Sequence, residues 1–202
     1  MSEKNSGFKK GDGARKQLLH ITDNIYSGFN AEKETAIVFL DIFSAFNRVW
    51  HEGLKYKFKC FGIEGPLYDW LCSYLSNRSQ KVVLNGSESS YQFTDAGVAQ
   101  GSILGPLCFL IFINDFEENL KSDVYLFADD STISKTYDNA LLAKQCLNND
   151  LLSIEIWAKQ WMVDFNVTKT TFVNFSIKKS NKSELTLFFK TNRLLKSRNT
   201  SI

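Results

Sequence analysis

Residues 125–134 read YLFADDSTIS, in which a pair of aspartates separates two short runs with strand character. Tyr125 to Ala128 and Ser131 to Ser134 are rich in apolar, aromatic or β-branched residues, which favour strands, whereas aspartate is common in tight turns. The stretch therefore predicts a β-hairpin whose two-residue turn consists of Asp129 and Asp130. Both carboxylates would stand at the tip of the hairpin. An acidic turn that is merely solvated is the alternative interpretation.

A second strand candidate lies upstream and ends on another aspartate. Residues 35–40 read TAIVFL, an apolar run without alternation, which predicts a buried strand with Asp41 at its end. Asp41 alone would also suit the N-terminal cap of a helix that opens near Ser44. Phosphoryl transfer to a 3′-hydroxyl uses two divalent cations, and Mg²⁺ needs only one or two carboxylates besides substrate oxygens and water. One aspartate at the end of a strand and two at the tip of a hairpin would meet that need, because rigid β elements hold such a cluster in place.

The rest of the chain predicts a mixture of helices and strands. Helices are expected over 13–28, 44–61, 66–75 and 138–163, and a glycine-rich loop over 97–105 leads into an apolar helix that ends near residue 119. Strands are expected over 80–84 and 91–94 around the turn Asn85-Gly86, and again over 171–177 and 184–190. Trp157 and Trp161 keep helical register with apolar neighbours, which predicts core residues rather than a base-stacking platform. One α+β domain follows.

Composition excludes several classes of protein. A chain of 202 residues that is 44% hydrophobic can bury a core, so disorder throughout is excluded. The longest apolar stretch, residues 103–113, is far shorter than the roughly 20 residues of a membrane span. The polar N-terminus does not resemble a signal peptide, so we expect no membrane partner and a cytoplasmic or nuclear location.

The number and spacing of the cysteines and histidines make carboxylates the candidate catalytic groups. The four cysteines lie far apart, without zinc-knuckle spacing, and are expected to be reduced. Two histidines are too few for a multi-histidine metal site. Residues 178–202 carry seven Lys or Arg and one Glu, so the basic charge is concentrated there and the rest of the chain is acidic. Such an end would contact phosphates or, more simply, remain solvated.

Further motifs, taken in order, resemble the reverse transcriptases of non-LTR (LINE-type) retrotransposons, particularly the jockey-like group. The similarity covers nearly the whole chain up to about residue 177, and its most specific part is the loop Gly97-Val98-Ala99-Gln100-Gly101-Ser102 with the apolar helix after it. The other matching motifs are Gly7-Phe8-Lys9-Lys10-Gly11, Phe39-Leu40-Asp41-Ile42 with Ala45-Phe46, Ser73-Tyr74-Leu75 with Asn77-Arg78, Phe127-Ala128-Asp129-Asp130, and Trp157 to Phe165-Asn166 with Lys169-Thr170.

The resemblance implies a role for each matching residue. Asp41, Asp129 and Asp130 would hold two Mg²⁺ ions, with Mn²⁺ as a substitute, and the Ile42 carbonyl would add a ligand. Phe46 would lie beneath the incoming sugar and exclude a 2′-hydroxyl, although a core phenylalanine is the alternative. Gln100 and Gly101 would line the nucleotide and template side. Lys169 would protonate pyrophosphate, unless it is a solvated surface lysine.

Some positions depart from the family pattern. The family has Ser-Lys-Ala-Phe-Asp where this chain has Phe43, Ser44, Ala45, Phe46 and Asn47, so a lysine and an aspartate are lost. Ala99 replaces a proline, which would loosen the loop before Gln100. Asp12 stands where an arginine is expected.

The resemblance implies a polymerase palm, an antiparallel sheet with packed helices, plus part of the fingers and without the thumb. The reverse transcriptase domain would span 1–177, and 178–202 would form a diverged or disordered basic tail. The implied activity is RNA-directed DNA polymerisation, with an RNA template, a DNA primer and deoxynucleoside triphosphates as partners. Two alternatives are a catalytically inactive retrotransposon remnant or nucleic-acid-binding module, and another palm-type enzyme such as a nucleotidyl cyclase, which the Gln100-Gly101-Ser102 loop disfavours.

Overall fold

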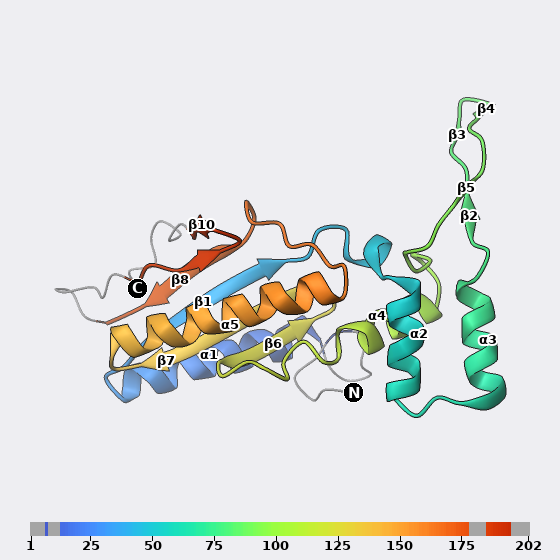
Figure 1. Cartoon of the computed structure of the whole chain (residues 1–202). Coiled ribbons are helices and arrows are strands. Elements are labelled where there is room, and N and C mark those ends of the chain that lie inside the picture. The colour runs from blue at the N-terminus through green and yellow to red at the C-terminus, as the bar shows by residue number, and fades with distance from the viewer. Residues whose placement is uncertain (1–6, 8–12, 178–184, 195–202) are drawn as a thin grey trace. The chain divides into compact units, whose positions relative to one another are not determined.

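The computed structural model describes residues 7, 13–177 and 185–194, which fold into two compact units (Figure 1). Unit 1 combines the chain up to Phe43 with the chain from Asn114 onward, and unit 2 is the continuous segment Ser44–Ile113. No Gly/Pro-rich linker marks this division in the sequence. None of the described helices is long and apolar enough to cross a membrane.

Unit 1 is built on a four-stranded antiparallel sheet. Its strands are β1 (Glu34–Asp41), β6 (Asp123–Phe127), β7 (Asp130–Tyr137) and β8 (Thr171–Phe175), in the spatial order β6-β7-β1-β8. The interior position of β1 explains its uninterrupted apolar run, and the strand predicted over 35–40 is confirmed. In the β1–β7 register, Glu34 pairs with Tyr137 and Asp41 pairs with Asp130.

One long helix covers each face of this sheet (Figure 1). Ile21 and Ile25 of α1 (Ala14–Asn30) pack on Ile37 of β1. On the other side, α5 (Ala140–Gln160) contributes buried Leu147, Leu151 and Ile154. The Asn139 side chain caps α5 by accepting from the backbone N–H groups of Leu141 and Leu142, which satisfies donors that have no partner inside the helix. Trp157 and Trp161 are buried, as predicted.

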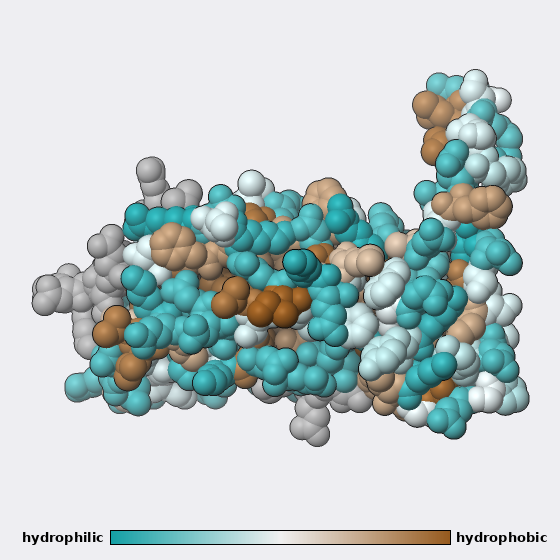
Figure 2. All heavy atoms as spheres, viewed as in Figure 1, coloured by the Kyte–Doolittle hydropathy of each residue, from teal (hydrophilic) through white to brown (hydrophobic). Residues whose placement is uncertain are grey.

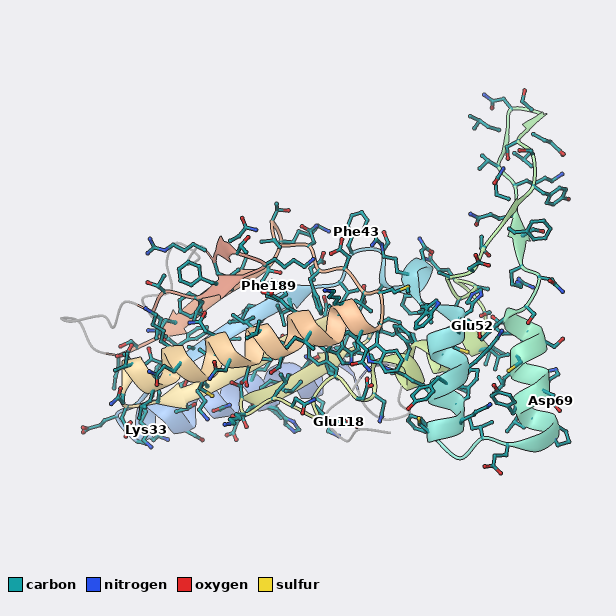
Figure 3. All side chains as sticks on the ribbon, viewed as in Figure 1. Lys33, Phe43, Glu52, Asp69, Glu118 and Phe189 are labelled. Atoms are coloured by element: carbon teal, nitrogen blue, oxygen red, sulfur yellow. The ribbon has the colours of Figure 1, made fainter. Side chains whose placement is uncertain are left out.

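A short hairpin near the C-terminus also belongs to unit 1. β9 (Phe188–Phe189) pairs with β10 (Asn192–Arg193), and the ring of Phe189, labelled in Figure 3, is fully buried and meets Phe165 edge to face at 5.6 Å. Residues 185–194 of the predicted tail are therefore folded, whereas its residues 178–184 and 195–202 lie outside the described residues. The strand predicted over 184–190 is shorter than expected, because a turn at Lys190 and Thr191 interrupts it.

Unit 2 contains three α-helices, α2 (His51–Cys60), α3 (Gly65–Leu75) and α4 (Leu104–Ile113), after the 3-10 turn η1 (Ala45–Arg48). The single helix predicted over 44–61 is wrong, since Val49 and Trp50 adopt extended backbone angles between η1 and α2. The helix predicted to end near residue 119 ends at Ile113. The residues after it form turns, with the Glu118 N–H donating to the Asp115 carbonyl.

The rest of unit 2 is a long hairpin arm, residues 79–93. β2 (Ser79–Gln80) pairs with β5 (Gln92–Phe93) at its base, and β3 (Val83–Leu84) pairs with β4 (Ser87–Glu88) at its tip. The predicted Asn85-Gly86 turn is confirmed, with φ of +49° and +80° as a two-residue hairpin turn requires. Figure 2 shows hydrophobic side chains on this arm, where Val82, Val83 and Leu84 are exposed.

Candidate active site

Two of the three predicted aspartates lie opposite each other at one end of the unit 1 sheet. Asp41 is the last residue of β1, and Asp130 is the first residue of β7 and its register partner. The Asp41 carbonyl accepts from the Asn166 N–H at 2.8 Å, on the strand edge that faces away from β7. The Asp41–Asp130 pair is therefore of the non-hydrogen-bonded type, in which opposed Cα atoms are about 4.5 Å apart and the side chains lie close.

The turn of the β6–β7 hairpin is shifted by one residue from the prediction. Phe127 pairs with Asp130, so the two turn residues are Ala128 and Asp129 rather than Asp129 and Asp130. Ala128 adopts φ of +55° with a buried side chain, a conformation that is unusual for a residue other than Gly, Asn or Asp. Because the turn lies one residue earlier than predicted, Asp130 pairs with Phe127 of β6 and with Asp41 of β1. Its side chain lies on the same face of the sheet as that of Asp41, and Asp129 remains in the turn beside it.

The three carboxylates affect one another electrostatically. Partial burial raises the pKa of Asp130, and the negative charges of Asp129 and then Asp41 raise it further. Asp129 and Asp130 are exposed. Among the described residues, Lys169 forms an ion pair with this cluster: its ammonium lies 3.6 Å from a carboxylate oxygen of Asp41. Because 67% of the Lys169 side chain is exposed, the pair contributes at most about 1 kcal/mol to stability and leaves the lysine able to move.

The segment from Asp164 to Thr170 supports the end of β1. The Phe43 N–H donates to the Asp164 carbonyl at 2.8 Å, beside the Asn166 bond to Asp41. These two bonds enclose Ile42, whose own N–H and carbonyl point to the opposite strand edge, toward β7. The Ile42 carbonyl is thus directed to the side of the aspartates, as its predicted role requires. The Phe43 ring stands clear of the ribbon (Figure 3).

The donor set suits a hard divalent cation. Three carboxylates and a backbone carbonyl supply only oxygen ligands, and the repulsion that raises the pKa of Asp130 is what a bound cation relieves. No three His, Cys, Asp or Glu side chains of the described segments converge into a complete metal site. Mg²⁺ that is also bound by substrate phosphates requires fewer protein ligands than such a complete site.

Unit 2 holds the other predicted residues. The half-buried Phe46 ring stacks on Phe109 of α4, with centroids 4.9 Å apart, so it is part of the packing of this unit. Gln100 is exposed, and its side-chain amide donates to Asn47 at 3.3 Å. Gly101 has φ of +78° and open space where a side chain would lie, which suits a close approach of a ligand to the backbone.

A lysine that no sequence motif singles out connects the C-terminal hairpin to this site. The Lys190 ammonium pairs with the Asp164 carboxylate and donates to the Phe165 carbonyl at 3.1 Å. Its backbone N–H also donates to Glu155 of α5. Lys190 lies in the stretch that we interpreted as a basic tail, where only its charge was considered, so no pattern in the sequence identifies its partner.

Comparisons with known proteins show the family of this chain. The family model described as reverse transcriptase (RNA-dependent DNA polymerase) matches residues 1–193. The probable RNA-directed DNA polymerase from transposon BS of Drosophila melanogaster is 32% identical over 180 residues, which cover 85% of this chain and 20% of that protein. The RNA-directed DNA polymerase from mobile element jockey of Drosophila funebris is 31% identical over 178 residues, covering 84% and 19%.

Among solved structures, an apo telomerase from Candida tropicalis, truncated from the C-terminal domain, aligns with a TM-score of 0.62. It is 13% identical, and the alignment covers 88% of this chain and 37% of that one, so the likeness concerns the fold. A polymerase-palm type of α+β fold is thereby confirmed. The chain spans about a fifth of the length of the curated relatives above.

Proposed function

This chain belongs to the reverse transcriptase family, and we propose that it carries the nucleotidyl-transfer centre of an RNA-directed DNA polymerase. Such a centre adds deoxynucleotides to the 3′-hydroxyl of a DNA primer along an RNA template. The observation that carries the proposal is the register pairing of Asp41 with Asp130, beside Asp129 in the turn, at an exposed end of the unit 1 sheet.

The proposed role of the aspartates is to hold divalent cations. Reverse transcriptases use divalent metal ions, and we propose two Mg²⁺, replaceable by Mn²⁺, with Asp41, Asp129, Asp130 and the Ile42 carbonyl as ligands. When bound, such ions promote attack by a 3′-hydroxyl and neutralise charge on the leaving pyrophosphate. The rigid ladder holds Asp41 and Asp130 in place, so little reorganisation is needed when substrate arrives.

Lys169 is the proposed general acid for the leaving pyrophosphate. Its ammonium is close enough to Asp41 to stay at the site and exposed enough to turn toward an anion. Protonation by a positioned lysine typically contributes 10²–10⁴-fold to a rate. Neutralising Lys169 with glutamine would therefore slow extension without removing it.

Residues of unit 2 would contact the nucleotide. Phe46 is proposed to support the sugar. Its stacking on Phe109 would hold the ring in place, so that the ring would exclude a 2′-hydroxyl by steric clash. Gln100 and Gly101 are proposed to line the nucleotide and template side, where the glycine backbone is open to a ligand.

Primer extension on an RNA template tests the proposal. We expect the full chain to extend a DNA primer with Mg²⁺ and deoxynucleotides, and Asp129→Asn to slow extension by roughly a thousand-fold, the size of several kcal/mol of lost charge stabilisation. Asp138→Asn is the matched control, because it removes the same charge from an exposed aspartate just after β7.

Two outcomes would contradict the proposal. Extension that is as fast with Asp129→Asn as with the unmodified chain would show that the aspartates do not act. If the unmodified chain fails to extend any primer, the chain is a catalytically inactive remnant or a binding module.

A further inference from the structure

Unit 2 contains a polar cavity of about 420 Å³ at the base of the hairpin arm. Its volume is within the range of small-molecule sites, roughly 300–1,000 Å³. The residues that line it carry one guanidinium, two amides and two hydroxyls, together with a stretch of loop, but no carboxylate. These groups belong to Arg78, Asn47, Gln80, Ser79, Thr94 and residues 96–99.

Backbone hydrogen bonds hold the loop wall of this cavity. The N–H groups of Gly97 and Val98 donate to the carbonyls of Val49 and Phe46, at 2.9 and 2.8 Å. The buried His51 ring is 2.7 Å from the Gly97 carbonyl. Gly97 has φ of +96°, and a Cβ there would lie 3.1 Å from the Asn47 carbonyl oxygen, so only glycine fits this close approach. This wall of the cavity is thus preformed.

Arg78 supplies the only charged side chain in the lining. Its guanidinium lies over the Tyr74 ring, 5.8 Å from the centroid, and is exposed. Among the described residues it forms no ion pair, so no carboxylate of that part of the chain competes for its donors. Its carbonyl accepts from the Thr94 N–H at 2.9 Å, which ties the two strands at the mouth of the cavity together.

Asn47 links the cavity to Gln100. Asn47 is one of the residues that line the cavity, and its side chain accepts from the Gln100 amide at 3.3 Å. With asparagine at position 47, no residue of the lining carries a negative charge. A cavity with a single cation and neutral hydrogen-bonding groups is suited to an anion that also carries polar groups.

We propose that this cavity binds one phosphate group of a nucleotide, with Arg78 donating to the phosphate oxygens. The fork of guanidinium donors matches phosphate geometry, and the amides and hydroxyls around it match a sugar or a base edge. The ligand class rests on the proposed function. The phosphate belongs either to a single-stranded RNA template or to a deoxynucleoside triphosphate, and the same chemistry serves both.

Equilibrium binding to the full 202-residue chain tests the proposal. One arm follows a labelled oligouridylate by fluorescence anisotropy across a salt series, and the other follows deoxythymidine triphosphate by calorimetry. Arg78→Gln is compared with Lys59→Gln. That control removes the same charge from another exposed side chain of unit 2, whose ammonium also lies over a tyrosine ring, Tyr68, at 5.1 Å.

Arg78→Gln should weaken binding about 10-fold in one arm, as expected for the loss of a charge-assisted hydrogen bond. In the RNA arm it should also reduce the salt slope by about 0.7, the contribution of one phosphate contact on a single strand. Arg78→Lys should keep the slope, whereas Asn47→Asp should weaken binding by repulsion. A loss confined to RNA identifies the template, and a loss confined to the triphosphate identifies the incoming nucleotide.

If Arg78→Gln and Lys59→Gln bind alike in both arms, the proposal is wrong. Circular dichroism spectra of the variants must match that of the unmodified chain, since only then does a loss of affinity report on the cavity. Because binding needs no catalysis, a chain that depends on Arg78 for binding but never extends a primer contradicts only the proposed polymerase activity. A chain that extends primers and binds independently of Arg78 contradicts only the cavity assignment.

Discussion

Asp41 and Asp130 occupy a position that ordinary sheet packing disfavours. Like charges directly opposite each other on neighbouring strands destabilise a sheet, and here a third carboxylate, Asp129, is adjacent in the turn. Lys169 offsets part of this repulsion for Asp41. The remaining repulsion helps to raise the pKa of Asp130, and a bound cation would relieve it.

The raised pKa of Asp130 leads to a prediction for the metal-free chain. The folded chain holds this proton more tightly than the unfolded chain does, so the free energy of unfolding falls as pH rises from the ordinary pKa of 3.8 through the raised pKa. Asp130→Asn removes this penalty. We expect it to stabilise the chain at neutral pH by less than about 1 kcal/mol, because the group is exposed, and to have no such effect below pH 3.8.

Urea unfolding without divalent cations, repeated across pH, measures this difference. Asp138→Asn serves as the control for a general loss of negative charge. Parallel stability curves for the unmodified chain and Asp130→Asn would contradict the prediction. Added Mg²⁺ should reverse the order at neutral pH, because it stabilises only the chain that retains the full set of carboxylates.

At the scale of elements, sequence patterns were reliable where local chemistry decides the structure. The apolar run before Asp41, the Asn85-Gly86 turn and the helical register of Trp157 and Trp161 each follow from neighbouring residues. The hairpin turn was misplaced because Ala128 adopts a left-handed conformation, which its residue type does not favour. The break at Val49 and Trp50 was missed because it depends on contacts distant in sequence, such as the bridge between Trp50 and Ala96.

The candidate site shows the same limit. That Asp41, Asp129 and Asp130 lie together could be predicted, because their residue types and order carry the family resemblance. The contacts that support them could not be predicted, since Asn166 acts through its backbone N–H and every residue type except proline supplies that group. The contact between Lys190 and Asp164 spans 26 positions and follows no periodic pattern. Such contacts depend on tertiary structure alone.

The link between the C-terminal hairpin and the end of β1 leads to an element-scale prediction. Lys190→Ala removes the ion pair with Asp164 and the bond to the Phe165 carbonyl, so the Asp164–Asn166 segment should separate more easily from β1. We expect the Phe43 and Asn166 amide hydrogens to exchange about 10-fold faster, which corresponds to a loss of roughly 1.4 kcal/mol from one partly exposed ion pair and one hydrogen bond.

Native-state hydrogen exchange resolved to single amides makes this measurement. Lys159→Ala is the matched control, because it removes the same side chain from the exposed side of α5. Amides in the centre of β1, such as that of Ile37, should be unaffected in both variants. Unchanged exchange at Phe43 and Asn166 in Lys190→Ala would show that the hairpin does not support the aspartate end of the sheet.

At the scale of the whole molecule, the two units differ in the number of chain segments that form them. Unit 2 is one continuous segment, whereas unit 1 is assembled from the two parts of the chain that flank it. The unit 1 sheet pairs β1 from the first part with β7 and β8 from the second, and all three proposed metal-binding aspartates lie in that unit. Stability of unit 1 therefore depends on residues late in the sequence.

A truncation tests where the fold ends. A chain that stops after Ile177 loses four buried apolar side chains, those of Leu185, Leu187, Phe189 and Leu194. Each contributes about 1.5–3 kcal/mol when fully buried, and the sum is comparable with the total stability of a typical domain, about 5–15 kcal/mol. We therefore expect residues 1–177 to lose cooperative urea unfolding, as followed by tryptophan fluorescence, while a chain that stops after Leu194 keeps it. Equal unfolding midpoints for the two truncations would instead place the domain boundary at residue 177, because the C-terminal hairpin would then add nothing to the stability of the sheet.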